Sequence, residues 1–253
     1  MALIVDHPAG GGVRANVRGV SVRGETRRRE ERRTKIIKPS FELIDRVDGA
    51  EVLKKIELCG RTCYKSEDRI NDGSTEKFVR GILKSGHESV IEHVSVTGRF
   101  ICDRGVSHEI VRHRIASYSQ ESTRYCNYSA EKFGGELTFI DPCGAFGWED
   151  GAEDQSRWMG AMADAENAYF DMIECGANPE EARSVLPNSL KTELVCTMNL
   201  REWRHFFRLR CSERAHPQMR EVALIALDVM REAIPVVFDD LWEKYFLAGK
   251  EDA

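Results

Sequence analysis

Several features are missing from this sequence, and each absence excludes a class of protein. Its 253 residues contain no long apolar run and no signal peptide, so we expect neither a membrane span nor a secreted protein. The eight cysteines form no CxxC pair, and Cys59 and Cys63, four residues apart, suit one helix face better than a zinc knuckle. We therefore expect reduced thiols in a cytoplasmic protein.

Nucleotide and metal signatures are also absent. No G-x-G-x-x-G motif follows a strand pattern and there is no P-loop, so no Rossmann domain is expected. His108 and His113 resemble the histidines of a zinc protease helix, but five residues on a helix separate side chains by roughly 140°. His87 and His93, six residues apart, are no better placed. We expect no metal site.

Charge is distributed unevenly along the chain. The net charge of −5 gives no general case for binding nucleic acid or a membrane surface. Residues 1–38 nevertheless carry ten Lys and Arg against four Asp and Glu. Because few apolar residues recur in residues 1–36, we expect a disordered basic extension there, with a nucleic-acid-binding arm as the alternative. Residues 37–253 then form one domain with a sizeable core.

Helix and strand patterns alternate along this domain. Strands are expected over residues 41–47, 91–101, 137–140 and 192–198. Four helices are expected to begin after the caps Asp48, Asp103, Asn178 and Asn199, the last with Glu202 as a capping-box partner. Further helices are expected from Ser74 to Gly86, over residues 152–175, from Pro217, and over residues 236–246. The predicted fold class is α/β (α+β), a mixed or antiparallel sheet packed against long helices.

The most distinctive stretch runs from residue 112 to residue 125, RHRIASYSQESTRY. It contains three arginines, a histidine and several hydroxyl side chains, and it follows a short helix predicted to end near Val111. Arginine offers planar, bidentate donors that match phosphate, and Ser and Thr hydroxyls complement them. Composition alone leaves two interpretations open: an anion-binding loop, or a solvated loop whose charges stabilise a helix C-terminus.

The spacing is more specific than the composition. Arg-His-Arg at 112–114, seven residues, Ser122, then Arg124 and Tyr125 resemble the signature of flavin-dependent thymidylate synthases of the ThyX type. The resemblance extends upstream to residues 86–93 (GHESVIEH), where His87, Ser89 and Glu92 fall in a motif that lines the family's flavin pocket. Downstream it includes residues 183–187 (RSVLP) and 199–210, so it spans roughly residues 38 to 235.

The resemblance implies both a function and an assembly. The function is reductive methylation of dUMP to dTMP, with methylenetetrahydrofolate as carbon donor, NADPH as reductant and FAD as cofactor. The assembly is a homotetramer of α/β subunits with active sites shared between chains. By resemblance, FAD contacts His87, Ser89, Arg112, His113, Arg114, Asn199, Arg201 and His205, and the nucleotide contacts Glu109, Gln120, Ser122, Arg124, Arg183 and Arg210.

Two other functions remain open: a flavin- or nucleotide-binding protein of the same fold without catalysis, and a nucleic-acid-binding protein built on the basic arm. The sequence also departs from one common form of the family pattern, with Ser119-Gln120 where Asn-Glu often stands and His205 where Asn often stands. Gln120 still offers hydrogen bonds but no charge. Ser122 has no evident neighbouring base to activate it as a nucleophile, so it is assigned to substrate binding.

Arg210 is the residue to which we assign a catalytic role. On a helix beginning at Asn199, its side chain falls within roughly 100° of Trp203, Phe206 and Phe207. A guanidinium on such an aromatic face is costly unless an anion or acceptor meets it. By resemblance, this arginine meets the uracil ring and stabilises charge that develops there. The alternative is an arginine whose stem packs while its head reaches solvent.

Overall fold

The computed structural model describes residues 34–130 and 134–247. Residues 1–33 of the predicted extension lie outside this range. Lys35 and Ile36, which the sequence assigns to the extension, instead belong to a strand. Among the described residues, no helix combines the length and the apolar composition that crossing a bilayer requires.

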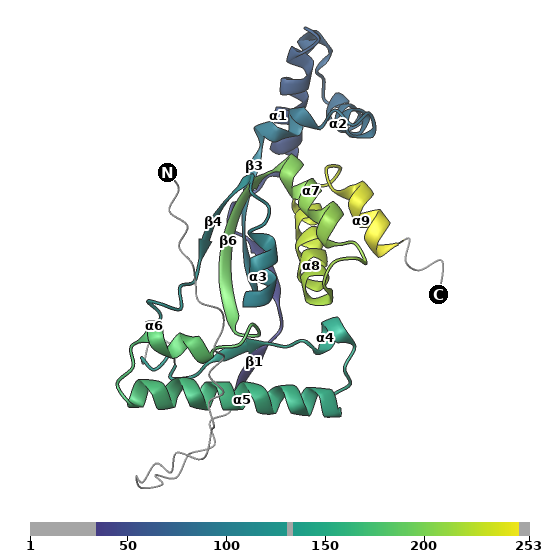
Figure 1. Ribbon diagram of the computed structural model, residues 1–253. Coiled ribbons are helices and arrows are strands. Elements are labelled where there is room, and N and C mark those ends of the chain that lie inside the picture. Colours follow the sequence, from purple (N-terminus) through teal and green to yellow (C-terminus); the bar gives the residue numbers. More distant parts are fainter. Residues whose placement is uncertain (1–33, 131–133, 248–253) are drawn as a thin grey trace, which may run out of the picture. The chain divides into compact units, whose positions relative to one another are not determined.

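A four-stranded antiparallel sheet forms the centre of the fold (Figure 1). Its strand order is β2 (Ser40–Leu43), β3 (Ser95–Asp103), β6 (Lys191–Asn199), β4 (Ala116–Gln120). A second, parallel pair joins β1 (Lys35–Ile37) to β5 (Thr138–Ile140). The prediction of a mixed α/β fold with antiparallel pairing and long helices is confirmed.

The helices include four that begin directly after the predicted caps Asp48, Asp103, Asn178 and Asn199, and one, over Cys143–Phe146, that the sequence did not predict. They are α1 (Gly49–Thr62), α2 (Ser74–Lys84), α3 (Arg104–Ile110), α4 (Cys143–Phe146), α5 (Glu153–Glu174), α6 (Pro179–Ala182), α7 (Leu200–Arg210), α8 (Pro217–Ala233) and α9 (Asp239–Phe246), with 3-10 turns η1 (Glu67–Arg69), η2 (Glu88–His93) and η4 (Arg183–Val185). The Asp48 carboxylate accepts from the amides of Ala50 and Glu51, and Asn178 forms a full capping box with Glu181. Local side-chain chemistry therefore fixes these helix starts.

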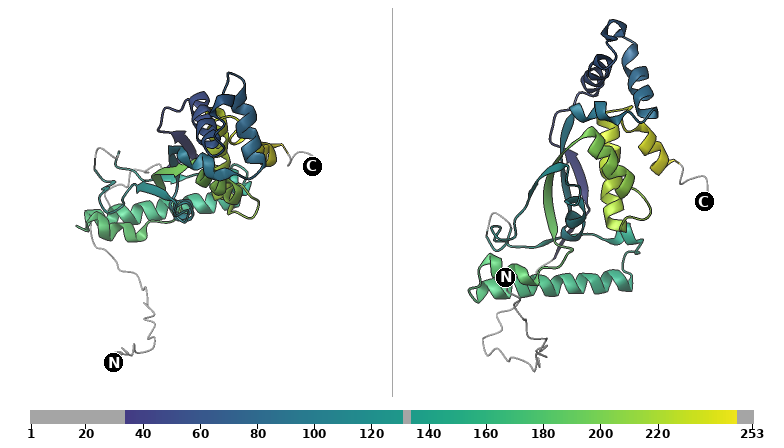
Figure 2. Two further views of the ribbon diagram at one scale, coloured as in Figure 1. Left: turned by 90° about the horizontal axis from the view of Figure 1, so that it is seen from above. Right: turned by 45° about the horizontal axis from the view of Figure 1, so that its top comes forward.

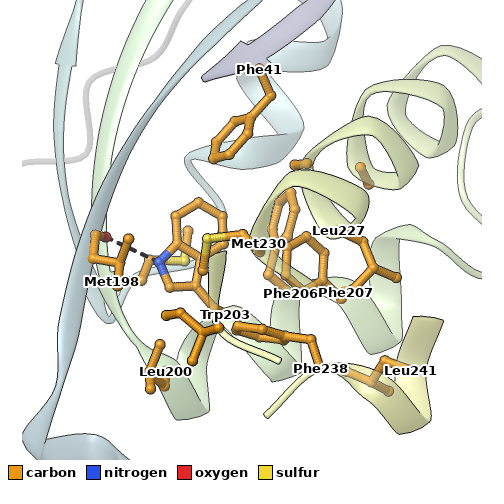
Figure 3. Packing of buried hydrophobic residues seen from close by; sticks show 14 of the residues in the cluster. Phe41, Met198, Leu200, Trp203, Phe206, Phe207, Leu227, Met230, Phe238 and Leu241 are labelled. Carbon is orange, nitrogen blue, oxygen red and sulfur yellow. Dashed lines mark hydrogen bonds between the residues drawn. The ribbon is translucent and has the colours of Figure 1, made fainter. Parts of the chain in front are cut away.

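The main core lies between the sheet and the helices α7 and α8, which cover one of its faces (Figures 1 and 2). Trp203, fully buried, is its largest side chain, and its indole Nε1 donates to the Val96 carbonyl at 3.1 Å. Its ring packs against Phe41 and Phe207 with centroids 5.8 and 5.7 Å apart (Figure 3). The aromatic face predicted for this helix is thus the part of α7 that fills the core.

A second core lies under the long helix α5. Met162 and Tyr169 from the predicted apolar stripe are buried there with Phe139 of β5. The stripe also contains one carboxylate, Glu166, which is 1% exposed and accepts from the Leu137 amide at 2.8 Å. This bond gives a partner both to the buried carboxylate and to the amide that precedes β5.

Three predicted element boundaries were wrong. Strand β2 ends at Leu43 rather than residue 47. Beyond it, the Thr97 amide of β3 donates to the Asp45 carboxylate at 2.7 Å instead of to a strand carbonyl. Residues 91–93, predicted as strand, belong to the 3-10 turn η2, and Ile91 is fully buried there. A short apolar run buries equally well in either conformation. The last helix begins at Asp239 rather than residue 236, after Val236 adopts a left-handed φ of 76°.

Gly98 of β3 provides a test of how tightly the core is packed. A Cβ at this position would overlap the Phe41 ring. Gly98→Ala is therefore expected to lower the free energy of unfolding by about 1–3 kcal/mol. The matched control is Gly160→Ala in the middle of α5, where no atom lies within 4 Å and where alanine should stabilise by up to about 1 kcal/mol. Urea unfolding of both variants measures this; equal stabilities would contradict the prediction.

Candidate active site

Helix α3 positions the Arg-His-Arg segment. The Asp103 carboxylate accepts from the Val106 amide at 2.7 Å and starts the helix, as predicted. The helix ends at Ile110, and residues 112–114 follow directly. The stretch after them is not the continuous polar loop that was expected, since Ala116–Gln120 forms edge strand β4 on β6. Pairing with β6 satisfies the backbone of this polar segment, which its composition did not indicate.

Arg210, at the end of α7, reaches across to this segment. Its Nη1 donates to the Glu109 carboxylate at 2.7 Å and its Nη2 to the Glu109 carbonyl at 3.0 Å. Its Nε donates to His113 Nε2 at 3.1 Å. The guanidinium is thus held in one plane by α3 and His113, and it does not extend freely into solvent.

These contacts determine which tautomer His113 adopts. A guanidinium can only donate, so Nε2 of His113 is an acceptor and the ring proton lies on Nδ1. Nδ1 lies 3.3 Å from Oε1 of Glu202, which accepts that proton's hydrogen bond. Glu202, His113, Arg210 and Glu109 therefore form one hydrogen-bonded chain, which we call the Arg210 relay.

Sequence reasoning assigned Glu202 only to a capping box. The Asn199 side chain does accept from the Glu202 amide at 2.9 Å, which confirms the cap. The Glu202 carboxylate, however, faces His113 and makes no return contact to Asn199 among the described residues. The only sequence signal for Glu202 was its position three residues after Asn199, which indicated a role in capping α7 and no contact with His113.

Burial controls the charge within the relay. Burial, the Arg210 guanidinium and His205 together lower the pKa of His113 to about 4, so its imidazole is neutral at physiological pH. Burial also raises the pKa of Glu202, partly offset by His205. A neutral His113 is the form that accepts from Arg210.

Acidification is expected to weaken the relay. The folded pKa of His113 lies below its ordinary value of 6.5, so its contribution to stability is complete above pH 6.5 and is lost as the pH falls through about 4. The pKa of Glu202 is raised by burial, so protonation of its carboxylate stabilises the folded state and opposes part of this loss. We therefore expect wild type, relative to His113→Gln, to lose stability between pH 6.5 and 4. Urea midpoints across this interval measure the difference, and parallel pH profiles would contradict it.

A cavity of about 450 Å³ adjoins the relay, and we call it the first cavity. Arg201, Glu202 and His205 line it from α7, Asn199 from the end of β6, and Glu88 and Glu92 from η2. Arg201 forms an ion pair with Glu92 across it. Arg201 and His205, four residues apart on α7, both face this cavity.

Three of the predicted nucleotide-binding residues, Gln120, Ser122 and Arg124, lie at the end of β4 and in the loop that follows it. The Gln120 amide donates to the hydroxyls of Ser107 and Thr192 at 2.8 and 3.2 Å. Arg183, from η4, donates to Thr123 at 3.5 Å, between Ser122 and Arg124. The structure therefore brings a residue 60 positions away beside the 122–124 loop. Helix α3 connects the two groups, because Ser107 faces Gln120 and Glu109 faces Arg210.

Comparison with known proteins identifies the family. The sequence model of the family described as "Thymidylate synthase complementing protein" matches residues 42–236. The chain belongs to this family. The flavin-dependent thymidylate synthase of Pyrococcus furiosus is 40% identical over 176 residues, which cover 69% of this chain and 70% of that protein. The enzyme of the same name from Geobacter sulfurreducens is 36% identical over 192 residues, covering 73% and 80%.

A solved structure has a similar fold. It is described as a UMP/dUMP methylase PolB from Streptomyces cacaoi bound with 5-Br dUMP. It aligns with a TM-score of 0.65 and 24% identity, covering 83% of this chain and 97% of that chain. The resemblance to flavin-dependent thymidylate synthases drawn from the 112–125 motif is thus confirmed.

Some family motif residues are not engaged within the described part of the chain. The Arg112 and Arg114 side chains form no hydrogen bond or ion pair with any described residue, and Arg114 is exposed. His87 and Ser89 are exposed at the start of η2. His87 lines a different cavity, bounded by α1 and α2. One chain of this thymidylate synthase family member therefore presents these donors without joining them into one closed site.

One group of side chains in the described residues has the composition of a metal site. Ligand atoms of His113, Glu202 and His205 lie within 4.8 Å of one another. Both ring nitrogens of His113 are already engaged, one by Arg210 and one by Glu202. A cation at Nε2 would displace and repel the Arg210 guanidinium, so the geometry favours the hydrogen-bonded relay.

Proposed function

We propose that this protein catalyses the reductive methylation of dUMP to dTMP, with methylenetetrahydrofolate as carbon donor, NADPH as reductant and FAD as cofactor. The observation that carries the proposal is the Arg210 relay, which holds a planar guanidinium beside the family's signature segment. Family membership supports the reaction class. Arg210 has the catalytic role because its fork is oriented before any substrate binds.

The residues present fit FAD. Arg112 and Arg114 offer guanidinium groups without described partners, which suits a pyrophosphate. Asn199, Arg201 and His205 offer donors at the first cavity. We propose that these five residues, with His113, His87 and Ser89, hold the cofactor. When bound, the flavin supplies the hydride that the methylation requires, since no side chain can.

The nucleotide contacts follow from side-chain chemistry. Ser122, Arg124 and Arg183 would bind the phosphate of dUMP, because two guanidinium groups and a hydroxyl complement a dianion. Glu109 and Arg210 would meet the uracil ring, where Arg210 stabilises developing negative charge. The Gln120 amide nitrogen is held by Ser107 and Thr192, which leaves its oxygen as a fixed acceptor for the base.

We further propose a homotetramer whose active sites are shared between chains. His87 and Ser89 would then complete a site whose arginines come from another subunit. The outer face of the four-stranded sheet supports this arrangement. It carries Ile101 and Val195 half-buried, and no described helix packs over it (Figure 1). Analytical ultracentrifugation of the full chain tests the assembly.

An absorbance spectrum of the purified protein tests the function. It should show a bound flavin that NADPH bleaches, and turnover should require dUMP and methylenetetrahydrofolate. A colourless protein that also fails to take up added FAD would overturn the proposal. A flavoprotein that never turns over dUMP would instead favour the non-catalytic alternative.

A further inference from the structure

A second cavity, of about 670 Å³, lies beside α1, η1 and α2. Three of the side chains that line it are cationic: Arg61, Arg69 and Lys77. No described carboxylate lines it. Two carboxylates of the same segment, Asp72 and Glu76, line a neighbouring cavity, which Lys77 also borders. This surface therefore has the electrostatic character of an anion site.

Arg61 is held in place by a buried acid. Glu57 is 1% exposed, and its Oε1 accepts from Arg61 Nη2 at 2.9 Å and from Nε at 3.1 Å. Its other oxygen accepts from the hydroxyls of Ser74 and Thr75 at 3.0 and 2.7 Å. The guanidinium also lies 4.6 Å above the centre of the Phe78 ring. Arg61 is thus preorganised by several contacts, unlike a solvated surface arginine.

Arg69 and Lys77 are the exposed cations of this cavity. Neither side chain forms an ion pair with a described residue, whereas many other cations of this chain do, such as Lys191 with Glu121 and Glu193. Like charges gathered on one concavity repel each other, and an anion bound between them removes that repulsion. The turn between them is rigid, since Asn71 and Ser74 are hydrogen-bonded within it.

The location of this cavity limits what it binds. His87 lines it, and the next residue, Glu88, lines the first cavity, so η2 forms the wall between the two. Under the proposed function, flavin binds beside His87 and the first cavity. A ligand of the second cavity can therefore have its anionic end among the three cations while its reactive end reaches the cofactor.

We propose that the second cavity binds the anionic end, phosphate or carboxylate, of a co-substrate that reacts at the flavin. This inference rests on the proposed function. Two co-substrates carry such groups. One is NADPH through its ribose phosphate, and the other is methylenetetrahydrofolate through its glutamate carboxylates. Both present several oxygens to Arg61, Arg69 and Lys77.

The double variant Arg69→Gln, Lys77→Gln tests the proposal in the full-length protein. Both residues are exposed, so the fold should tolerate the change. We expect the KM for one co-substrate to rise roughly 10-fold or more, with kcat, FAD content and dUMP affinity unchanged. The matched control is Lys84→Gln, an exposed lysine of the same helix that does not line the cavity. An equal change in the control would show general charge effects and overturn the proposal.

Two arms of the experiment distinguish the sources. If the variant loses its preference for NADPH over NADH, the phosphate is the ligand. If it loses its preference for triglutamated over monoglutamated folate, the carboxylates are the ligand. Calorimetry with 2′-AMP and with triglutamate, on wild type and variant, separates this inference from the proposed function because it needs no turnover. Unchanged KM values in an active protein would overturn the inference, as would the absence of both binding signals in an inactive one.

Discussion

Arg210→Ala is expected to keep its flavin and its assembly but to lose turnover by about 10²- to 10³-fold. The reason is the geometry of the relay: three donors of one guanidinium are fixed by Glu109 and His113 before substrate binds. Under the proposed function, this guanidinium stabilises negative charge that develops on the uracil ring, so its removal should slow that step. Nucleotide-dependent oxidation of reduced flavin, measured in single turnovers, separates this step from cofactor binding.

Two further variants decide whether Arg210 acts by charge, by shape or by packing. Arg210→Lys should fail to restore turnover, because an ammonium cannot donate to Glu109 and His113 in one plane. Arg210→Met keeps a stem of similar length without any charge, and it should be inactive. If the Met variant turns over, or if all three variants unfold, Arg210 is structural and the assignment is wrong.

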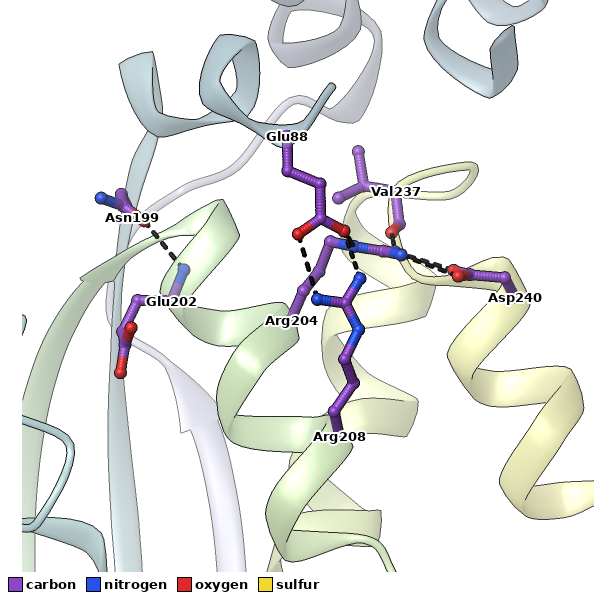
Figure 4. A network of polar contacts seen from close by, with 7 residues as sticks. All are labelled: Glu88, Asn199, Glu202, Arg204, Arg208, Val237 and Asp240. Carbon is purple, nitrogen blue, oxygen red and sulfur yellow. Dashed lines mark hydrogen bonds and ion pairs between the residues drawn. The ribbon is translucent and has the colours of Figure 1, made fainter. Parts of the chain in front are cut away.

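Arg204→Ala should produce the largest loss of stability among single substitutions of charged residues in α7. Arg204 is 1% exposed and donates to Asp240 through two nitrogens at 2.7 Å and to Glu88 at 3.0 Å (Figure 4). It also donates to the Val237 carbonyl. Its removal leaves that carbonyl and a nearly buried Glu88 short of partners. We expect a loss of about 3–5 kcal/mol in the free energy of unfolding.

An exposed ion pair provides the control for this prediction. Arg80 pairs with Asp239 at 2.9 Å, but its side chain is 54% exposed. Arg80→Ala should therefore cost at most about 1 kcal/mol. Arg204→Met, which keeps most of the buried stem, separates lost packing from lost charge. Urea unfolding of the three variants gives the comparison, and a cost for Arg204→Ala no greater than that for Arg80→Ala would refute the argument.

Local sequence signals predicted much of the fold. Asp48, Asp103, Asn178 and Asn199 cap helices as expected, because a cap depends on atoms only two or three residues away. The stripe of α5 and the strand β6 also follow from side-chain period. In contrast, β4 was missed because its hydroxyl-rich sequence has no strand signal of its own. Its pairing with β6 depends on a partner more than 70 residues away.

The candidate site shows the same division. The motif at 112–125 indicated the family, and the resemblance then implied site roles for Arg112, His113, Arg114 and Ser122. The sequence could not assign Glu202 to the relay, since its position on the helix indicated a cap and nothing about His113. The contact between Arg210 and Glu109 spans 101 residues. The site residues themselves stay a prediction that the variants above would test.

The amino-acid sequence by itself determined the class of this protein, its four capped helix starts and its family, because caps, periods and motifs are short-range and chemically specific. Only the tertiary structure decided the tautomer of His113, the orientation of Arg210 and the cationic character of the second cavity. Each of these depends on the direction in which a side chain points and on what meets it there. Burial then sets the protonation state, as the lowered pKa of His113 shows. Such properties arise only when distant segments pack together and exclude water.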